Sequence, residues 1–294
     1  MRLSGEECIL LKSMKGVVQG AGRGKRSFVL NSRLWLQIQL LKSLVQRDLE
    51  ARYKGSVLGN LWPLISQLSQ LVVYTYVFAI VLQVKLNLQG LPENNFTFGM
   101  WLFAGLLPWM TFSNSLQQAT NAVVFQPNLV KKVVFPLPLL PLVPVLSAFI
   151  ESTFGLMALI LLVAVVAHTV HWTLWLLPLV WVPQLLFTAG LAYFGAALTV
   201  FLRDIPQSIA VILNFWLYLT PICYPAAVIP QPWQGLVFWL NPMAAIVEVY
   251  RDLVLVGEVK HLGEWMSATV VSLIVFYAGL WLYRKLRPAF ADVL

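Results

Sequence analysis

Six apolar segments divide this chain, each close to the length of about 20 residues that a helix needs to cross a bilayer. Hydrophobic residues make up 59% of the sequence and charged residues only 11%, whereas soluble domains carry about 25% charged residues. The length suits one domain of several spans. The sequence therefore predicts an all-α, polytopic membrane protein, with residues 29–294 as one transmembrane domain of six helices at about 61–82, 99–119, 139–167, 174–201, 207–223 and 266–283.

Basic residues gather on one side of the predicted spans. Of the 20 lysines and arginines, 17 fall in the N-terminal segment, in the connections after spans two and four, and in the C-terminal tail. Cytosolic loops of membrane proteins carry such an excess, so we expect both termini in the cytosol. The net charge of +8 follows this distribution. We therefore do not predict nucleic-acid binding.

The segment before the first span divides into a tail and a helix. Residues 1–28 hold scattered bases among glycines and are expected to form a flexible basic tail near an anionic leaflet. Apolar side chains recur every three or four positions in residues 29–54. This pattern predicts an amphipathic helix in the cytosolic interface; the alternative is a helix packed on the protein's own loops. Gly55 and Gly59 relax the backbone at the boundary, and Pro63 fits the first turn of the first span.

Two proline-rich stretches depart from simple spans. Pro136, Pro138, Pro141 and Pro144 crowd the start of the third span, where we expect them to kink or delay the helix. Residues 224–265 are largely apolar but contain four further prolines. We predict a pair of short re-entrant helices in the outer leaflet between spans five and six. Irregular backbone survives at that depth only when it is buried in protein or lines water.

Glu151 is the only acidic residue inside a predicted span. A charge at the bilayer centre costs about 2.5 to 3.5 kcal/mol on insertion scales for comparable residues. Two interpretations follow. The carboxylate faces a hydrated pathway or another polar helix, or it is protonated or hydrogen-bonded to Ser147 or Ser152 and purely structural.

Neutral polar and aromatic side chains within the spans are candidates for contact with a hydroxylated cargo. Amides and ring faces together hold carbohydrate without charge. In a helix bundle the same amides also serve as interhelical hydrogen-bonding groups, and this alternative stays open for each of them. With Glu151 included, the predicted translocation pathway contains Gln67, Gln70, Tyr74, Trp101, Trp109, Glu151 and Asn214.

The sequence shows no residue pattern typical of catalysis or of metal binding. His168 and His171 supply two ligands, which do not complete a zinc site. The glycine-rich run near Lys25 differs from a phosphate-binding loop, because Gln19 and Arg26 stand where that motif needs glycine and serine or threonine. We therefore expect no catalytic residue, metal or cofactor in this chain, and an energy source in a partner or a gradient.

Two motifs carry a family resemblance. Residues 47–63 (RDLEARYKGSVLGNLWP) resemble the N-terminal signature of ABC-2-type permeases that export polysaccharides, a family that includes O-antigen, capsule and teichoic-acid exporters. Residues 128–136 (NLVKKVVFP) resemble the cytosolic element between spans two and three of that family. Weaker similarities follow in the same order at residues 203–205, 220–225 and 241–242. The likeness covers roughly residues 30–290.

The resemblance implies a half-transporter in the cytoplasmic (inner) membrane. Two copies of the chain would form the pathway as a homodimer, and two copies of a separate ABC ATPase subunit, which binds ATP and Mg²⁺, would drive it. The cargo would be a glycan on a polyprenyl-diphosphate lipid from the inner leaflet. The implied positions are Asn128, Leu129, Lys131 and Lys132 for coupling to the ATPase, and Arg47, Arg52 and Lys54 for the lipid headgroup.

Alternatives remain at this stage. The three bases at Arg47, Arg52 and Lys54 would serve equally well to bind ordinary lipid phosphates or the ATPase. A gradient-driven transporter would need coupling residues at the midplane, for which Glu151 is the one candidate, and inverted repeats, which the sequence does not show. A polytopic membrane enzyme would need paired acids or a catalytic histidine.

Overall fold

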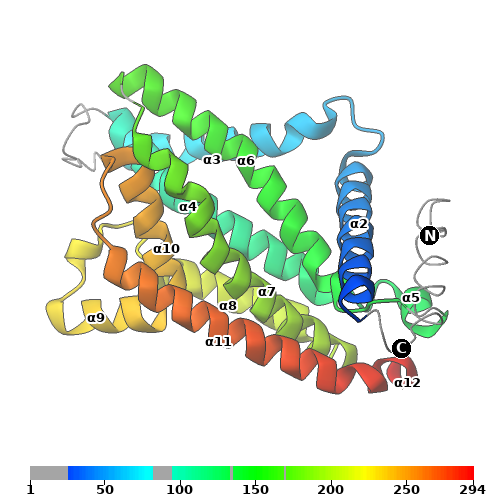
Figure 1. Cartoon of the computed structure of the whole chain (residues 1–294). Coiled ribbons are helices and arrows are strands. Elements are labelled where there is room, and N and C mark those ends of the chain that lie inside the picture. The colour runs from blue at the N-terminus through cyan, green and yellow to red at the C-terminus, as the bar shows by residue number, and fades with distance from the viewer. Residues whose placement is uncertain (1–25, 82–94, 133–134, 169) are drawn as a thin grey trace.

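The computed structural model describes residues 26–81, 95–132, 135–168 and 170–294. Every regular element in this part of the chain is helical, as the sequence predicts. Residues 1–25, which make up most of the predicted basic tail, lie outside it. Figure 1 shows long helices packed obliquely in a bundle, with α2 (Arg26–Tyr53) at its flank.

Each predicted span overlaps a helix of the structure. Three described stretches are long and apolar enough to cross a membrane, at Leu139–Val166, Trp172–Phe201 and Leu262–Val293, and Ile205–Leu219 is a shorter apolar helix. The count of six crossings therefore stays a prediction. The helices are α3 (Trp62–Tyr74), which continues as a π-helix (Thr75–Val81), α4 (Asn95–Asn121), α6 (Leu139–Ala167), α7 (Leu177–Phe201) after a 3₁₀ turn (Trp172–Leu176), α8 (Ile205–Leu219) and α11 (Leu262–Leu286).

Helix α4 runs through the centre of the bundle. Every residue from Thr97 to Trp109 is buried, and the helix packs against α6, α7 and α10 (Pro242–Arg251). A helix enclosed by protein needs no lipid-facing apolar stripe. This position explains why α4 carries more polar residues than α6 although it forms the core.

Helix α2 has two different apolar faces. Leu36, Leu40 and Leu44 are buried, and Leu40 and Leu44 belong to a core cluster with residues of α6 and α7. Leu34 and Ile38 are exposed to 55% and 62%. The helix thus packs on its own protein, as the alternative interpretation held, and also keeps an apolar surface of the kind that suits a membrane interface.

The turn from α2 into α3 has the backbone that the sequence predicts. Gly55 and Gly59 adopt positive φ angles of 83° and 48°, a region that favours glycine. Pro63 lies in the first turn of α3, where its missing N–H costs no hydrogen bond. Trp62 donates a hydrogen bond of 2.6 Å from Nε1 to Ser56 Oγ, which closes the turn.

Of the prolines at the start of the third span, Pro136 and Pro138 lie ahead of the helix, which agrees with the predicted delay, and Pro141 and Pro144 lie within it. Helix α6 begins at Leu139, directly after Pro138, and continues through Pro144 to Ala167. A proline in the first turn removes no helical hydrogen bond. Pro144 lacks the N–H that would bond to the carbonyl four residues earlier, so the helix loses one hydrogen bond there. The helix nevertheless continues to Ala167.

The segment between α8 and α11 contains the expected pair of short helices, α9 (Gln231–Leu240) and α10. All of α10 is buried in protein, whereas α9 exposes Trp233 and Trp239 to 61% and 69%. Asn241 joins them: its amide donates to Thr220 Oγ1 at 2.8 Å and its Oδ1 caps α10 by accepting from Met243 N. Their depth in the outer leaflet stays a prediction.

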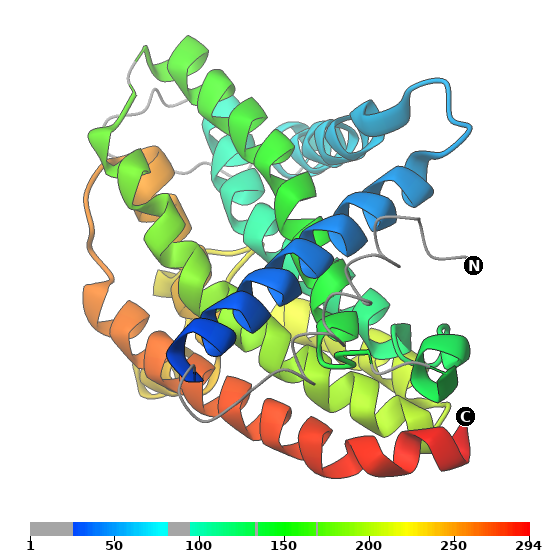
Figure 2. The same cartoon turned by 45° about the vertical axis from the view of Figure 1, so that its right-hand side comes forward.

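The segments expected in the cytosol lie together at one end of the bundle. Figures 1 and 2 show α5 (Pro127–Lys132), α12 (Phe290–Val293) and the C-terminus at this end, away from the loop between α6 and α7. A buried cluster that includes Val123, Tyr193 and Phe290 ties these segments to the bundle.

Candidate functional site

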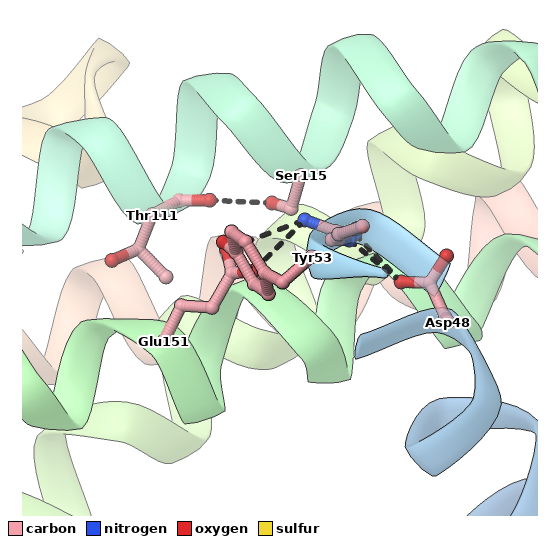
Figure 3. Close-up of polar contacts among 6 residues, drawn as sticks. Asp48, Tyr53, Thr111, Ser115 and Glu151 are labelled. Carbon is pink, nitrogen blue, oxygen red and sulfur yellow. Dashed lines mark hydrogen bonds and ion pairs between the residues drawn. The ribbon is translucent and has the colours of Figure 1, made fainter. Parts of the chain in front are cut away.

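Glu151 of α6 is bound by the C-terminal end of α2 (Figure 3). Arg52 Nη1 lies 3.3 Å from Glu151 Oε2 and 3.4 Å from Oε1. The Tyr53 hydroxyl donates a 2.7 Å hydrogen bond to Glu151 Oε1. Asp48, one turn earlier in α2, accepts hydrogen bonds of 2.7 and 3.0 Å from the same guanidinium. A single cluster therefore fastens α2 to α6.

This cluster agrees with one of the interpretations of Glu151 made from the sequence, because the carboxylate faces a polar helix, α2. Glu151 lies about 18 Å along α6 from Leu139 at 1.5 Å per residue, and its side chain is only 17% exposed. An opposite charge and a hydroxyl donor compensate the cost of placing the carboxylate there. Ser147 does not take part, because its buried Oγ has no partner.

The protonation state of Tyr53 follows from its surroundings. Burial, and after it the hydrogen bond to Glu151, raises the pKa of Tyr53 above its ordinary value. The phenol therefore keeps its proton at physiological pH and acts as a donor to the carboxylate. Thr111 and Ser115 of α4 lie beside the cluster in Figure 3 and bond back to their own helix, to Leu107 O and Thr111 O.

A cleft of about 370 Å³ lies between α2 and the end of α4, next to this cluster. Arg47 and Asp48 line it from α2, and Gln117, Gln118 and Asn121 line it from α4. The three bases predicted at the lipid headgroup are thus separated by the structure. Arg47 lines the cleft, Arg52 is engaged in ion pairs, and Lys54 is exposed in the turn after α2.

The predicted polar pathway residues do not meet in a single copy of the chain. Gln67 is half-buried and packs its amide directly over Gly155 of α6, with Oε1 buried and without a hydrogen-bond partner. Gln70 of α3 and Asn214 of α8 are exposed, and Tyr74 is half-buried next to Phe78. Their shared role in a pathway stays a prediction.

The two predicted pathway tryptophans belong to α4 and are buried in the core of the bundle. Trp101 is 4% exposed, with the Arg251 guanidinium 3.5 Å from its ring centroid. Trp109 is 5% exposed and packs edge-on against Phe112 and Trp216. In the described chain these rings contact protein groups.

Arg251, in the segment between predicted spans five and six, is a buried polar residue that the sequence analysis did not single out. Its side chain is 3% exposed and forms an ion pair of 2.7 Å with Glu248. It also donates to three backbone carbonyls, of Trp101 at 3.3 Å and of Pro221 and Ile222 at 2.7 Å each. Glu248 and Arg251 stand one helical turn apart in a largely apolar segment, and this spacing was the available signal.

The predicted coupling residues form α5, a helix of six residues at the surface. Asn128 and Lys131 are exposed. Leu129 and Val130 pack on the buried cluster that includes Val123 and Phe290. The side chain of Lys132 lies outside the described residues. The helix therefore exposes polar side chains on one side and packs its apolar side chains on the buried cluster on the other.

Comparisons with known proteins agree with this architecture. Residues 39–255 match the family described as ABC-2 type transporter. The chain is 32% identical over 254 residues to the O-antigen export system permease protein RfbA of Myxococcus xanthus, which covers 86% of this chain and 94% of that protein. It is 28% identical over 272 residues to the protein of the same name from Klebsiella pneumoniae, which covers 91% of this chain and all of that protein. The chain belongs to the ABC-2 type transporter family.

Proposed function

We propose that this chain is the membrane-spanning permease subunit of an ATP-driven exporter that moves a lipid-linked polysaccharide, such as O-antigen, from the inner leaflet across the cytoplasmic membrane. The family match and the names of the similar permeases support this proposal. The glycan is carried on a polyprenyl-diphosphate lipid, and the pathway forms between two copies of the chain.

The geometry of α5 carries the proposal. Its exposed Asn128 and Lys131 offer polar contacts to a partner, while Leu129 transmits force into the buried cluster below. Two copies of a separate ATPase subunit dock there, bind ATP and Mg²⁺, and move α5 as they close. Any such coupling requires contacts that differ between the two states of the permease.

The proposed topology has six spans, both termini in the cytosol, and α9 and α10 in the outer leaflet. The gathering of α5, α12 and the C-terminus at one end supports a shared cytosolic side. The fully buried α10 supports a re-entrant position, because backbone at membrane depth must be covered by protein.

The residues of the proposed pathway divide by their environment. Gln70 and Asn214 are exposed in a single copy and are free to face a second copy across the pathway. Glu151, Trp101 and Trp109 are occupied by contacts within the chain, which supports a structural contribution. Of the basic residues, Arg47 lines the cleft and Lys54 is exposed in the turn, and we assign both to contact with a lipid diphosphate.

Two alternatives receive less support. A capsule or teichoic-acid glycan would need the same machinery, but the similar permeases are named for O-antigen. A gradient-driven transporter would use Glu151 as its coupling group, and the ion pair with Arg52 already accounts for that carboxylate.

The proposal is tested by deleting the gene and restoring it. Loss of the permease should remove the glycan from the cell surface and leave lipid-linked glycan inside the membrane, and the wild-type gene should reverse both effects. Asn128→Ala with Lys131→Ala should fail to restore export and should lose the ATPase on purification, whereas Lys260→Ala, at an exposed lysine outside α5, should behave as wild type. Normal surface glycan in the deletion strain would refute the proposal.

A further inference from the structure

The cleft beside Arg47 has walls of a particular chemistry. Its volume of about 370 Å³ lies near the lower end of the range of about 300–1,000 Å³ for small-molecule pockets. This size suits a headgroup and excludes a whole glycan chain. Four side-chain amides line it, from Gln117, Gln118, Asn121 and Gln126, together with Arg47, Asp48 and the ring of Phe125. Six apolar residues complete the wall: Leu44, Ala51, Ala122, Leu140, Val143 and Pro144.

The amides come mainly from one face of α4. Asn121 follows Gln117 and Gln118 by four and three positions, and residues so spaced are neighbours on a helix surface. Gln117 is held by a hydrogen bond of 3.2 Å from Nε2 to Ser113 Oγ. A side-chain amide both donates and accepts, which matches a hydroxyl group that does the same. The row is therefore suited to a ligand with several adjacent hydroxyls.

Phe125 adds an apolar platform. Its side chain is 77% exposed and lines the cleft at the turn between α4 and α5. This exposure leaves the ring accessible to a ligand in the cleft. A ring face next to hydrogen-bonding groups gives the combination of apolar body and polar contacts that a sugar ring also presents.

The charges of the cleft argue against a general anion site. Asp48 stands next to Arg47 in the wall, and it is paired with Arg52 at 2.7 Å. Arg52 in turn shares its charge with Glu151. Among the described residues that line the cleft, Arg47 is the one base, and most of the wall is uncharged.

From these features we infer that the cleft binds a pyranose ring, the sugar unit nearest the diphosphate of the lipid-linked cargo. The amides of α4 take its hydroxyls, Phe125 covers its apolar face, and Arg47 contacts the adjoining phosphate. This inference rests on the proposed function and assigns to this chain the recognition of the lipid-proximal sugar. It distinguishes a sugar-bearing lipid from an ordinary phospholipid.

Native mass spectrometry of the full chain in detergent tests the inference with three probes: polyprenyl diphosphate, polyprenyl diphosphate bearing one hexose, and phosphatidylglycerol. The wild type should bind the sugar-bearing lipid about tenfold more tightly than the other two, as two or more added hydrogen bonds allow. Gln118→Ala with Asn121→Ala should abolish this preference and leave the affinity for polyprenyl diphosphate unchanged. Arg47→Gln should weaken both diphosphate lipids. Gln207→Ala, an exposed amide on α8, is the matched control.

Equal binding of all three lipids by the wild type would overturn the inference and make the cleft a general lipid site. A preference that survives in the double variant would overturn it as well. If the double variant binds the lipids as wild type does but loses the ATPase on purification, the cleft is a subunit contact. Each of these results leaves the proposed export function standing, because that function is judged by export in cells and not by binding to the cleft.

Discussion

The guanidinium of Arg52, at the end of the N-terminal helix, lies 3.3 Å from the carboxylate of Glu151, ninety-nine residues later in the chain. Each side chain is 17% exposed, so the pair is neither at the surface nor fully buried. It therefore joins α2, the helix that precedes the first predicted span, to α6.

Removing this ion pair should loosen α2 from the bundle. Glu151→Gln or Arg52→Gln should lower the stability by about 1–2 kcal/mol, between the values typical of surface and of buried pairs. The exchange of both residues, Arg52→Glu with Glu151→Arg, should recover part of the loss. Thermal unfolding in detergent measures these differences. Equal stability of the wild type and both single variants would show that the pair contributes nothing.

The buried arginine should be much more sensitive. Arg251→Leu leaves Glu248 unpaired inside the protein, which typically costs about 3–5 kcal/mol. Arg251→Lys should not restore stability, because an ammonium cannot reproduce the planar fork that reaches Pro221 and Ile222. In fluorescence-detected size exclusion, Arg251→Leu and Arg251→Lys should lose the peak of folded protein. Arg203→Ala, in an exposed turn, should keep that peak.

Helices α7 and α11 touch through a pair of glycines. A Cβ atom added to Gly279 would collide with the carbonyl of Gly190. Small residues allow such close approach in membrane proteins. Gly279→Ala should therefore cost about 1–3 kcal/mol through overpacking. Gly263→Ala in the same helix meets open space and should be neutral or slightly stabilising. Equal unfolding temperatures for the two variants would contradict this contact.

His261 should make one turn sensitive to pH. Its ring nitrogen lies 2.8 Å from Asp252, and this hydrogen bond raises the pKa of His261 above its ordinary value although burial lowers it. A raised pKa gives stability that is fully present below the unfolded pKa of about 6.5 and is lost as the pH rises through the folded pKa. The wild type should thus exceed His261→Gln in stability more at pH 6 than at pH 9. A difference independent of pH would exclude a charged pair.

Hydropathy and turn chemistry predicted most of the helices but not all of their boundaries. The third span was predicted at 139–167, and α6 has the same limits, because a long and mostly apolar run between Pro138 and His168 defines it. The fifth was predicted to end at residue 223 and α8 ends at Leu219, because Thr220 turns to an extended backbone ahead of Pro221. The prolines of α6 disturb the helix little, because only Pro144 removes a helical hydrogen bond.

The candidate site was only partly predictable. The sequence singled out Glu151 as the acidic residue inside a predicted span, and the family resemblance implied Arg52 as one of three bases at the lipid headgroup. Their pairing depends on how α2 crosses α6, and no local pattern specifies that crossing. Trp101 was expected to face a pathway, but it lies beneath Arg251, whose burial follows from the enclosure of α10 by neighbouring helices. The periodicity of apolar residues along a helix does not predict such contacts between helices.

The proposed function makes this chain a permease that is driven by a separate ATPase. Proteoliposomes containing the permease, the ATPase and a fluorescent lipid-linked glycan test it most directly, with glycan movement measured against added ATP. We expect transport and ATP hydrolysis only when both polypeptides and ATP are present, and loss of transport when Asn128→Ala and Lys131→Ala are combined. Transport by the permease alone, or driven by an ion gradient without ATP, would contradict it.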